Sequence, residues 1–178
     1  QVGMHAIAED EDRLIEYALE RLAKVPGIVV YGDPDLSRCP RTGAISINLE
    51  GCDHAFTAAV LNDYYNIAVR NECFCAHPYV REMVMLSFAE VADSLTNAEI
   101  EQLAEMHRGM VRASFGLYSV RADIDALVAA LGEIGARRDE LMPLYERQPN
   151  GDYVHRHFRP DLGSEFSTRS VVDAMLEG

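Results

Sequence analysis

The sequence predicts an α+β domain with a small, mainly antiparallel sheet and helices packed on one face. One observation is strict alternation over residues 44–50, where Ile45, Ile47 and Leu49 share one side, as in a half-buried strand. A second is helical periodicity in long segments that alternate with short β-rich runs, an order typical of a sheet-and-helix layer design. In chain order, we expect a helix over residues 9–23, strands over 28–31 and 44–50, a helix over 53–65 and a strand over 67–70. Helices within 79–110, a strand over 111–118 and a helix over 119–134 are expected to follow.

Several residues mark the expected helix ends. Asp53 is placed to cap the N-terminus of the second helix, and Asn66 follows its end, where a left-handed residue is favoured. Thr96 and Glu99 have the spacing of a capping box. Ser119 is the expected cap of the last long helix, and beyond about residue 148 the pattern fades into a polar, aromatic tail.

The composition excludes several classes of function. The 178 residues have a net charge of −13, which argues against nucleic acid and anionic membranes as partners. No apolar run is long enough to span a bilayer, and no secretory signal opens the chain. Four cysteines in a domain of this size do not indicate a disulfide framework, so we expect a reducing, cytoplasmic environment.

The residues best suited to a chemical role lie in the stretch 66–78. A short apolar run, expected to be a buried strand, ends at Arg70, and Cys73, Cys75 and His77 follow. An arginine suits a carboxylate or phosphate, and a thiol near a cation can act as a nucleophile. The alternatives are an arginine paired with a structural acid, cysteines that pack as small hydrophobic residues, and a zinc site made by Cys73, Cys75 and His77.

Other polar residues are expected to have no role in a site. Cys39 and Arg41 lie in a predicted loop and are expected at the surface. His155 and His157 are expected to be exposed in the tail. Of the sixteen basic residues, Lys24 is the single lysine, so a mechanism that needs a lysine must use Lys24 or a residue outside this chain.

Three segments, taken together, carry a family resemblance. They resemble the C-terminal domain of class V aminotransferases, the fold-type-I pyridoxal-phosphate (PLP) enzymes that include cysteine desulfurases. The resemblance covers roughly residues 10–145. The segments are Leu22 to Gly32; Arg41 to Ser46 with Ile67 to Arg70 and Cys75 to Pro78; and Val111 to Tyr118 followed by Asp123 to Asp125.

The resemblance implies roles for three residues. Cys75 matches the cysteine that attacks the sulfur of a PLP-bound cysteine substrate in the desulfurase branch. Arg112 matches the arginine that binds the substrate α-carboxylate, and Arg70 matches a second arginine of the same pocket. Two differences from the family stand out: Glu72 replaces a usual glycine, and the gap from Cys75 to Arg112 is long. A molybdenum-cofactor-sulfurase-like, aminotransferase or epimerase activity therefore stays open.

The resemblance also implies that this chain is one part of a longer enzyme. Residues 9–147 would form the C-terminal small domain, and residues 148–178 a C-terminal extension. The large domain, with the Schiff-base lysine and the phosphate site, has no counterpart here. We expect PLP and an amino-acid substrate in the full-length homodimer, and neither a cofactor nor a metal on this chain alone. Lys24 is expected to be a solvated helix-end residue. The alternative from another class is a non-catalytic binding domain.

Overall fold

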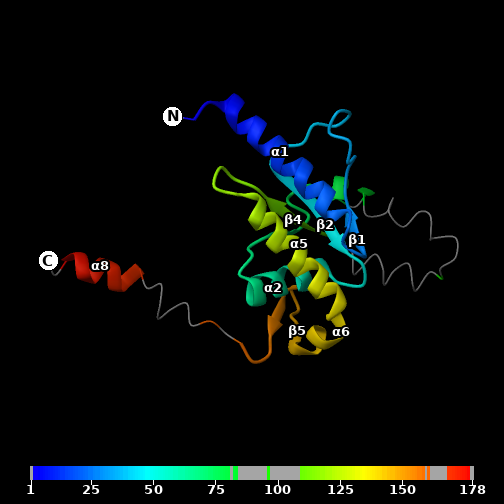
Figure 1. Cartoon of the computed structure of the whole chain (residues 1–178). Coiled ribbons are helices and arrows are strands. Elements are labelled where there is room, and N and C mark those ends of the chain that lie inside the picture. The colour runs from blue at the N-terminus through cyan, green and yellow to red at the C-terminus, as the bar shows by residue number, and fades with distance from the viewer. Residues whose placement is uncertain are drawn as a thin grey trace.

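The computed structural model describes residues 2–80, 82–83, 96, 109–158, 160 and 168–176. Within these residues the helices and strands follow the predicted order, with a short helix, a 3-10 helix, a β-hairpin and a last helix added after residue 137 (Figure 1). The elements are α1 (Met4–Leu22), β1 (Ile28–Val30), β2 (Ala44–Leu49), α2 (His54–Tyr65), β3 (Arg70–Glu72), β4 (Met110–Ser114), α5 (Arg121–Ala136), α6 (Arg138–Leu141), the 3-10 helix η1 (Met142–Leu144), β5 (Tyr145–Arg147), β6 (Tyr153–His155) and α8 (Thr168–Leu176).

The main sheet has four strands in the order β1-β2-β4-β3, and every neighbouring pair is antiparallel. The register places Ser46 of β2 opposite Arg112 of β4, and Arg112 opposite Arg70 of β3. The predicted α+β class with a small antiparallel sheet is therefore confirmed. Strands β3 and β4, far apart in the chain, are neighbours in the sheet, and their pairing brings the two arginines onto one face.

The main core lies between the sheet and the helices α1, α2 and α5. Figure 1 shows α1 and α5 running side by side across the sheet. Helical periodicity turns an apolar stripe of each helix inward, and alternation does the same for the strands. The most completely buried large side chains of this core include Phe56, Ile15, Leu22, Ile45, Ile47, Leu131 and Ile134.

The opposite face of the sheet carries a second, smaller cluster, formed by Tyr31, Val80 and Met110. Cys73 and Phe74 pack against it. The alternation in β2 predicted a solvent-facing side here, but Asn48 is 2% exposed, so that expectation is wrong for this residue. The reason is tertiary: the chain after β3 returns over this face, and residues 77–80 and 82–83 are helical. Both faces of the sheet therefore contain buried side chains.

The boundaries of several elements differ from the prediction. Residues 67–69 were expected to be a strand, but β3 begins at Arg70. Asn66 has φ 54°, as predicted, and Ile67 donates its N–H to Leu61 O at 3.0 Å. The apolar run thus directly follows the left-handed C-cap of α2, and β3 starts only after it. At the start of the chain, α1 begins at Met4 rather than near residue 9.

The strand predicted over 111–118 ends at Ser114, and the helix expected at Ser119 begins at Arg121. The cause is a turn in which Ser119 Oγ accepts the N–H of Gly116 at 3.0 Å. Because Ser119 is occupied in this turn, Asp123 Oδ2 accepts the N–H of Val120 instead, at 2.8 Å. The N-cap predicted at Asp53 is confirmed, since its side chain accepts the N–H of Ala55.

Residues 145–155 form a hairpin, where the sequence indicated a tail with little periodicity after residue 148. Strand β6 pairs with β5, and the turn between them contains Gly151 with φ 94°. Tyr145 and Tyr153 both pack edge-on against Phe56, with ring centroids 5.5 and 5.6 Å away. Aromatic packing onto the main core thus orders this segment, and the expected domain boundary at residue 148 falls inside the hairpin.

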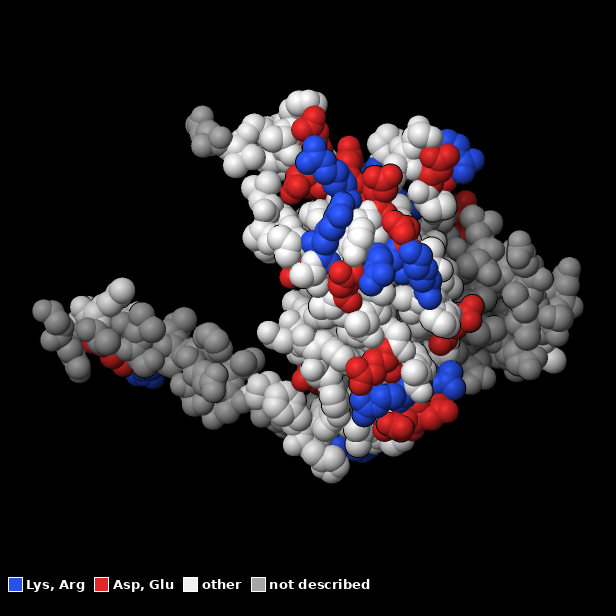
Figure 2. Space-filling model, viewed as in Figure 1, with Lys and Arg blue, Asp and Glu red and all other residues white. Residues whose placement is uncertain are grey.

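Acidic and basic side chains are interspersed over the face formed by α1 and α5 (Figure 2). Among them, Arg21 Nε lies 2.9 Å from Asp125 Oδ1, joining the two helices. Among the helices of the described residues, none is long and apolar enough to cross a membrane. The helices predicted between about 84 and 108 lie outside the described residues, as does Glu99, the second residue of the capping box predicted with Thr96.

Candidate active site

Arg70 and Arg112 are direct cross-strand partners on the face of the sheet opposite the main core. Directly opposed side chains in an antiparallel pair lie close together, and like charges in that arrangement are destabilising. Among the described residues, no carboxylate forms an ion pair with either arginine. Two arginines on paired strands that have no acidic partner among the described residues favour an anion, and the fork geometry of a guanidinium suits a carboxylate.

The guanidinium of Arg112 is held by an aromatic ring. Its Cζ lies 5.0 Å from the centroid of the Phe74 ring, a cation–π contact. Its Nε is buried and has no hydrogen-bond acceptor among the described residues. Arg70, by contrast, is exposed. Phe74 therefore orients the partly buried Arg112 while leaving donor groups available.

A tight turn after β3 presents the two cysteines. Ala76 donates its N–H to Cys73 O at 2.7 Å, and the two residues between them, Phe74 and Cys75, have φ of 50° and 64°. Two positive φ angles at the centre of such a turn are typical of type I′, which normally uses Asn or Gly. Residues that lack this freedom are strained there, and such strain clusters at functional sites.

The four thiols differ in burial. Cys75 and Cys39 are exposed, whereas Cys73 is partly buried and Cys52 is fully buried. Burial raises the pKa of the Cys52 thiol to about 11. Burial raises the pKa of the Cys73 thiol, and the negative charge of Glu72 raises it further. Because the thiolate is the reactive form, Cys75 is better suited than Cys73 to act as a nucleophile.

Glu72 occupies a conformation that favours glycine. Its φ is 85°, in the left-handed region, which accounts for the glycine that usually stands at this place in the family it resembles. A Cβ on Gly109 would lie 2.6 Å from Glu72 Cα and 2.9 Å from His54 Nε2. The end of β3 therefore closely approaches Gly109, the residue that precedes β4.

Replacing Glu72 by glycine should increase the free energy of unfolding by about 1 kcal/mol, because glycine adopts positive φ without a steric penalty. The same change should lower the pKa of Cys73, since it removes a neighbouring negative charge. Urea denaturation and the pH dependence of Cys73 alkylation measure the two effects. As a control, Glu146→Gly in β5 should lower stability, because that strand position needs no positive φ. A loss of stability in Glu72→Gly equal to the control would contradict this account.

Other polar residues have structural contacts. Arg41, expected at the surface, is partly buried and donates from Nη2 to the carbonyl oxygens of Tyr31 and Asp33 at 2.9 and 3.0 Å. Cys39 is exposed, as predicted. Lys24 is exposed and its Nζ lies 2.7 Å from Glu20 Oε1, as expected for a solvated helix-end residue.

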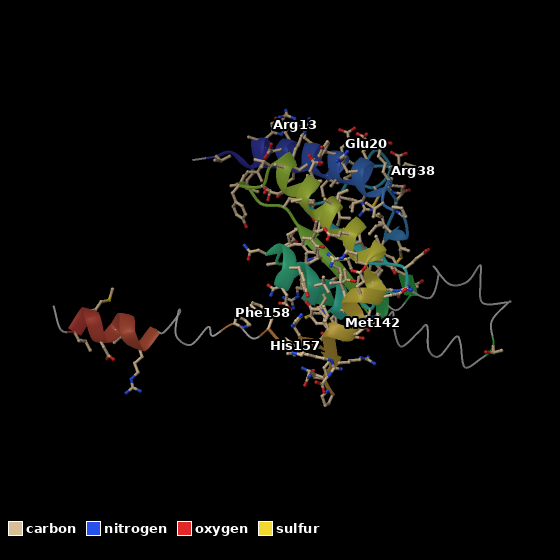
Figure 3. The ribbon with its side chains drawn as sticks, turned by 60° about the horizontal axis from the view of Figure 1, so that its bottom comes forward. Arg13, Glu20, Arg38, Met142, His157 and Phe158 are labelled. Atoms are coloured by element: carbon tan, nitrogen blue, oxygen red, sulfur yellow. The ribbon has the colours of Figure 1, made fainter. Side chains whose placement is uncertain are left out.

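His155 is the last residue of β6, and His157 follows the hairpin; Figure 3 shows His157 and Phe158 at the end of the molecule away from Arg13 and Glu20. His157 is exposed, as predicted, but His155 is partly buried. The Nδ1 atom of His155 accepts the N–H groups of His157 and Phe158 at 3.1 and 2.9 Å. Within the described ranges, no three His, Cys, Asp or Glu side chains are grouped to hold a metal ion, so the zinc alternative gains no support.

Two residues of the site were not predicted from the sequence. Phe74 was passed over because a phenylalanine between two cysteines has no motif of its own, and its contact with Arg112 depends on the fold. Asn48 was placed on a solvent-facing side, yet its amide donates to Tyr31 Oη and Gly109 O, both at 3.0 Å. The sequence did not distinguish Asn48 from Ser46, the other polar residue of the strand.

Comparison with known proteins decides the family. The sequence model of the class V aminotransferase family matches residues 1–127 of this chain. The chain belongs to this family. It is 34% identical over 133 residues to a cysteine desulfurase of Escherichia coli O127:H6 and also 34% identical to one of Serratia proteamaculans. A cysteine desulfurase of Yersinia pseudotuberculosis is 31% identical over 134 residues. The matches cover 75% of this chain and 26% of each relative, so the chain spans about a quarter of their length.

Solved structures of cysteine desulfurases share the fold. The cysteine desulfurase CsdA of Escherichia coli, in an S-sulfonic acid form, superposes with a TM-score of 0.51 at 24% identity, over 81% of this chain and 27% of that one. The apo cysteine desulfurase of Thermococcus onnurineus NA1 superposes with a TM-score of 0.52 at 23% identity, over 73% of this chain and 26% of that one. The class V aminotransferase chain described here thus has the fold of one part of these larger proteins.

Class V aminotransferases depend on PLP, but the described residues of this chain do not fit the cofactor by themselves. PLP enzymes hold it as a Schiff base with a lysine. The single lysine, Lys24, projects from the C-terminal end of α1 into solvent and is paired with Glu20. The two arginines of the sheet face suit a substrate carboxylate, but they cannot replace the missing lysine.

Proposed function

We propose that this chain is the C-terminal small domain of a longer PLP-dependent cysteine desulfurase. In this proposal Arg112 and Arg70 bind the α-carboxylate of the cysteine substrate, and Cys75 receives its sulfur. The relatives at 31–34% identity, all cysteine desulfurases, support the reaction class. The domain preceding this chain would supply the lysine and the phosphate site, and a homodimer is the expected assembly.

The observation that carries the proposal is the direct opposition of Arg70 and Arg112 beside the cysteine turn. Their charges repel across the strand pair, and a bound carboxylate would relieve that repulsion. Phe74, the second residue of the turn, contacts Arg112, so the carboxylate site and the thiol are parts of one local structure. A substrate held at its carboxylate by Arg112 would then lie near Cys75.

In this proposal, the thiolate of Cys75 accepts sulfur from the substrate. Cys75 Sγ would attack the sulfur of the substrate, an S–S bond would form, and the carbon–sulfur bond would break with its electron pair left on carbon. That carbon then takes a proton, giving alanine and a persulfide on Cys75, with no oxidant needed. PLP, when bound in the longer enzyme, supplies the stabilisation of negative charge on the substrate. An exposed thiol meets the steric requirement, and the partly buried Cys73 does not.

Sulfide release from cysteine by the longer protein tests the proposal. Cys75→Ala should abolish release in the presence of a thiol reductant, because no other thiol of the turn is exposed to accept sulfur. Cys73→Ala, two residues away, is the matched control and should retain most of the activity. Equal activity of the wild type and Cys75→Ala would remove Cys75 from the mechanism. No release from either, together with transfer of the amino group to a keto acid, would favour an aminotransferase.

This chain on its own should form no Schiff base with PLP. After incubation with PLP and reduction by borohydride, we expect no stoichiometric adduct, because Lys24 lies on an exposed helix end and not in a pocket of the described structure. Mass spectrometry of the reduced protein measures the outcome, and Lys24→Arg provides the background. One equivalent of PLP attached to Lys24 would show that the cofactor site is in this chain.

A further inference from the structure

Asn48 is a buried amide on the face of the sheet that carries Arg112. It is 2% exposed, and its Nδ2 donates to Tyr31 Oη and to Gly109 O, both at 3.0 Å. Its Oδ1 is also buried and meets no donor among the described residues. A buried polar atom without a partner lowers stability, so this oxygen contributes nothing to the fold; the contribution of Asn48 lies in the two bonds that its Nδ2 donates, which an apolar side chain could not make. The role of the amide therefore depends on what these two bonds hold in place.

The bond to Gly109 extends the contact between β2 and β4. The backbone pairing of these strands runs from Ala44–Ser114 to Ile47–Val111. Beyond it, the side chain of Asn48 on β2 donates a hydrogen bond to the carbonyl oxygen of Gly109. Gly109 immediately precedes β4, so Asn48 fixes the strand that places Arg112 on the sheet face.

The same bond fixes the cysteine turn. Gly109 lies against the backbone of Glu72, since a Cβ on Gly109 would be 2.6 Å from Glu72 Cα. Glu72 ends β3, and the turn that presents Cys75 begins at the next residue. Tyr31, the second acceptor of the Asn48 amide, belongs to the cluster against which Cys73 and Phe74 pack. Through Gly109 and Tyr31, the amide thus connects β2 with the end of β3 before the turn and with the cluster on which Cys73 and Phe74 pack.

We propose that Asn48 is a positioning residue that holds the turn 73–76 in a fixed place relative to the strand bearing Arg112. Its importance for catalysis rests on the proposed function, but the positioning itself is a property of this chain. Asn48 touches neither reacting atom. It acts through Gly109 and Tyr31 on the two elements that would hold the substrate carboxylate and the nucleophilic thiol.

The four cysteines allow a direct test on the 178-residue chain. Cys73 reports on the turn, Cys52 in the main core reports on global unfolding, and exposed Cys39 is the reference for intrinsic reactivity. Alkylation by iodoacetamide under native conditions is followed for each cysteine by mass spectrometry. For Asn48→Leu we expect the ratio of Cys73 to Cys39 rates to rise about fivefold while the ratio of Cys52 to Cys39 stays unchanged, since one turn opens locally.

Controls separate positioning from a general loss of structure. Ser46→Ala, on the same strand and face, should leave both ratios at their wild-type values. Asn48→Ala removes both donors without introducing a larger apolar side chain or a buried charge, and should reproduce the rise at Cys73 even if Asn48→Leu fails to fold. A parallel rise at Cys73 and Cys52 would show that Asn48 supports only global stability. No rise at Cys73 in a folded variant would likewise overturn the proposal. Neither result depends on desulfurase activity.

Discussion

Arg112→Lys should weaken the binding of cysteine to the longer enzyme about a hundredfold, because a lysine keeps the charge but loses the paired donors that match a carboxylate. It also loses the contact between the guanidinium and the Phe74 ring. Since the lost interaction is with a part of the substrate that does not react, the effect should fall mainly on KM, with a smaller effect on kcat. Steady-state kinetics of sulfide release measure both parameters.

The control substrate and the control variant make this prediction specific to the carboxylate. Cysteamine is cysteine without its carboxylate, so its competition with cysteine should be changed little by Arg112→Lys. Arg147→Lys alters an exposed arginine of β5 in the same chemical way and should leave KM unchanged. If affinity for cysteine and cysteamine fell together in Arg112→Lys, the arginine would serve the architecture of the site and not the recognition of the carboxylate.

The local signals in the sequence were sufficient for the fold class. The alternation of Ile45 and Ile47 predicted a strand, and Asp53 and Asn66 marked the two ends of α2 correctly. These features depend on neighbouring residues alone, which is why one sequence reveals them. The apolar run 67–69 was misassigned because Ile67 and Val69, just after the left-handed C-cap of α2, pack against the core as the residues of a buried strand do.

The geometry of the site depends on contacts between distant residues. The sequence and the family resemblance selected Arg70, Cys75 and Arg112, but no local pattern indicates that Arg70 and Arg112 face each other. Their opposition results from the strand order, in which β4 lies between β2 and β3. The hairpin after residue 144 was missed for the same reason, since its order comes from packing of its tyrosines on Phe56.

Gly109→Ala should lower the free energy of unfolding by about 2–3 kcal/mol, the usual cost of forcing an extra methyl group into a filled space. The atoms that it would meet are Glu72 Cα and C, at 2.6 and 2.9 Å, and backbone atoms cannot rotate away as the end of a side chain can. The strain should be relieved by separation of β3 from β4, which would also move the cysteine turn. Urea denaturation measures the loss, and hydrogen exchange of the Arg70–Glu72 amides locates it.

A matched glycine in the same chain gives the opposite expectation. A Cβ on Gly132, in the middle of α5, meets no atom within 4 Å, so Gly132→Ala should raise stability by up to about 1 kcal/mol through helix propensity. Opposite signs for the two substitutions would attribute the effect at 109 to the approach of β3. If Gly109→Ala were as stable as the wild type with unchanged protection of β3, that approach would not be required, and the link from β4 to the cysteine turn would lose its physical basis.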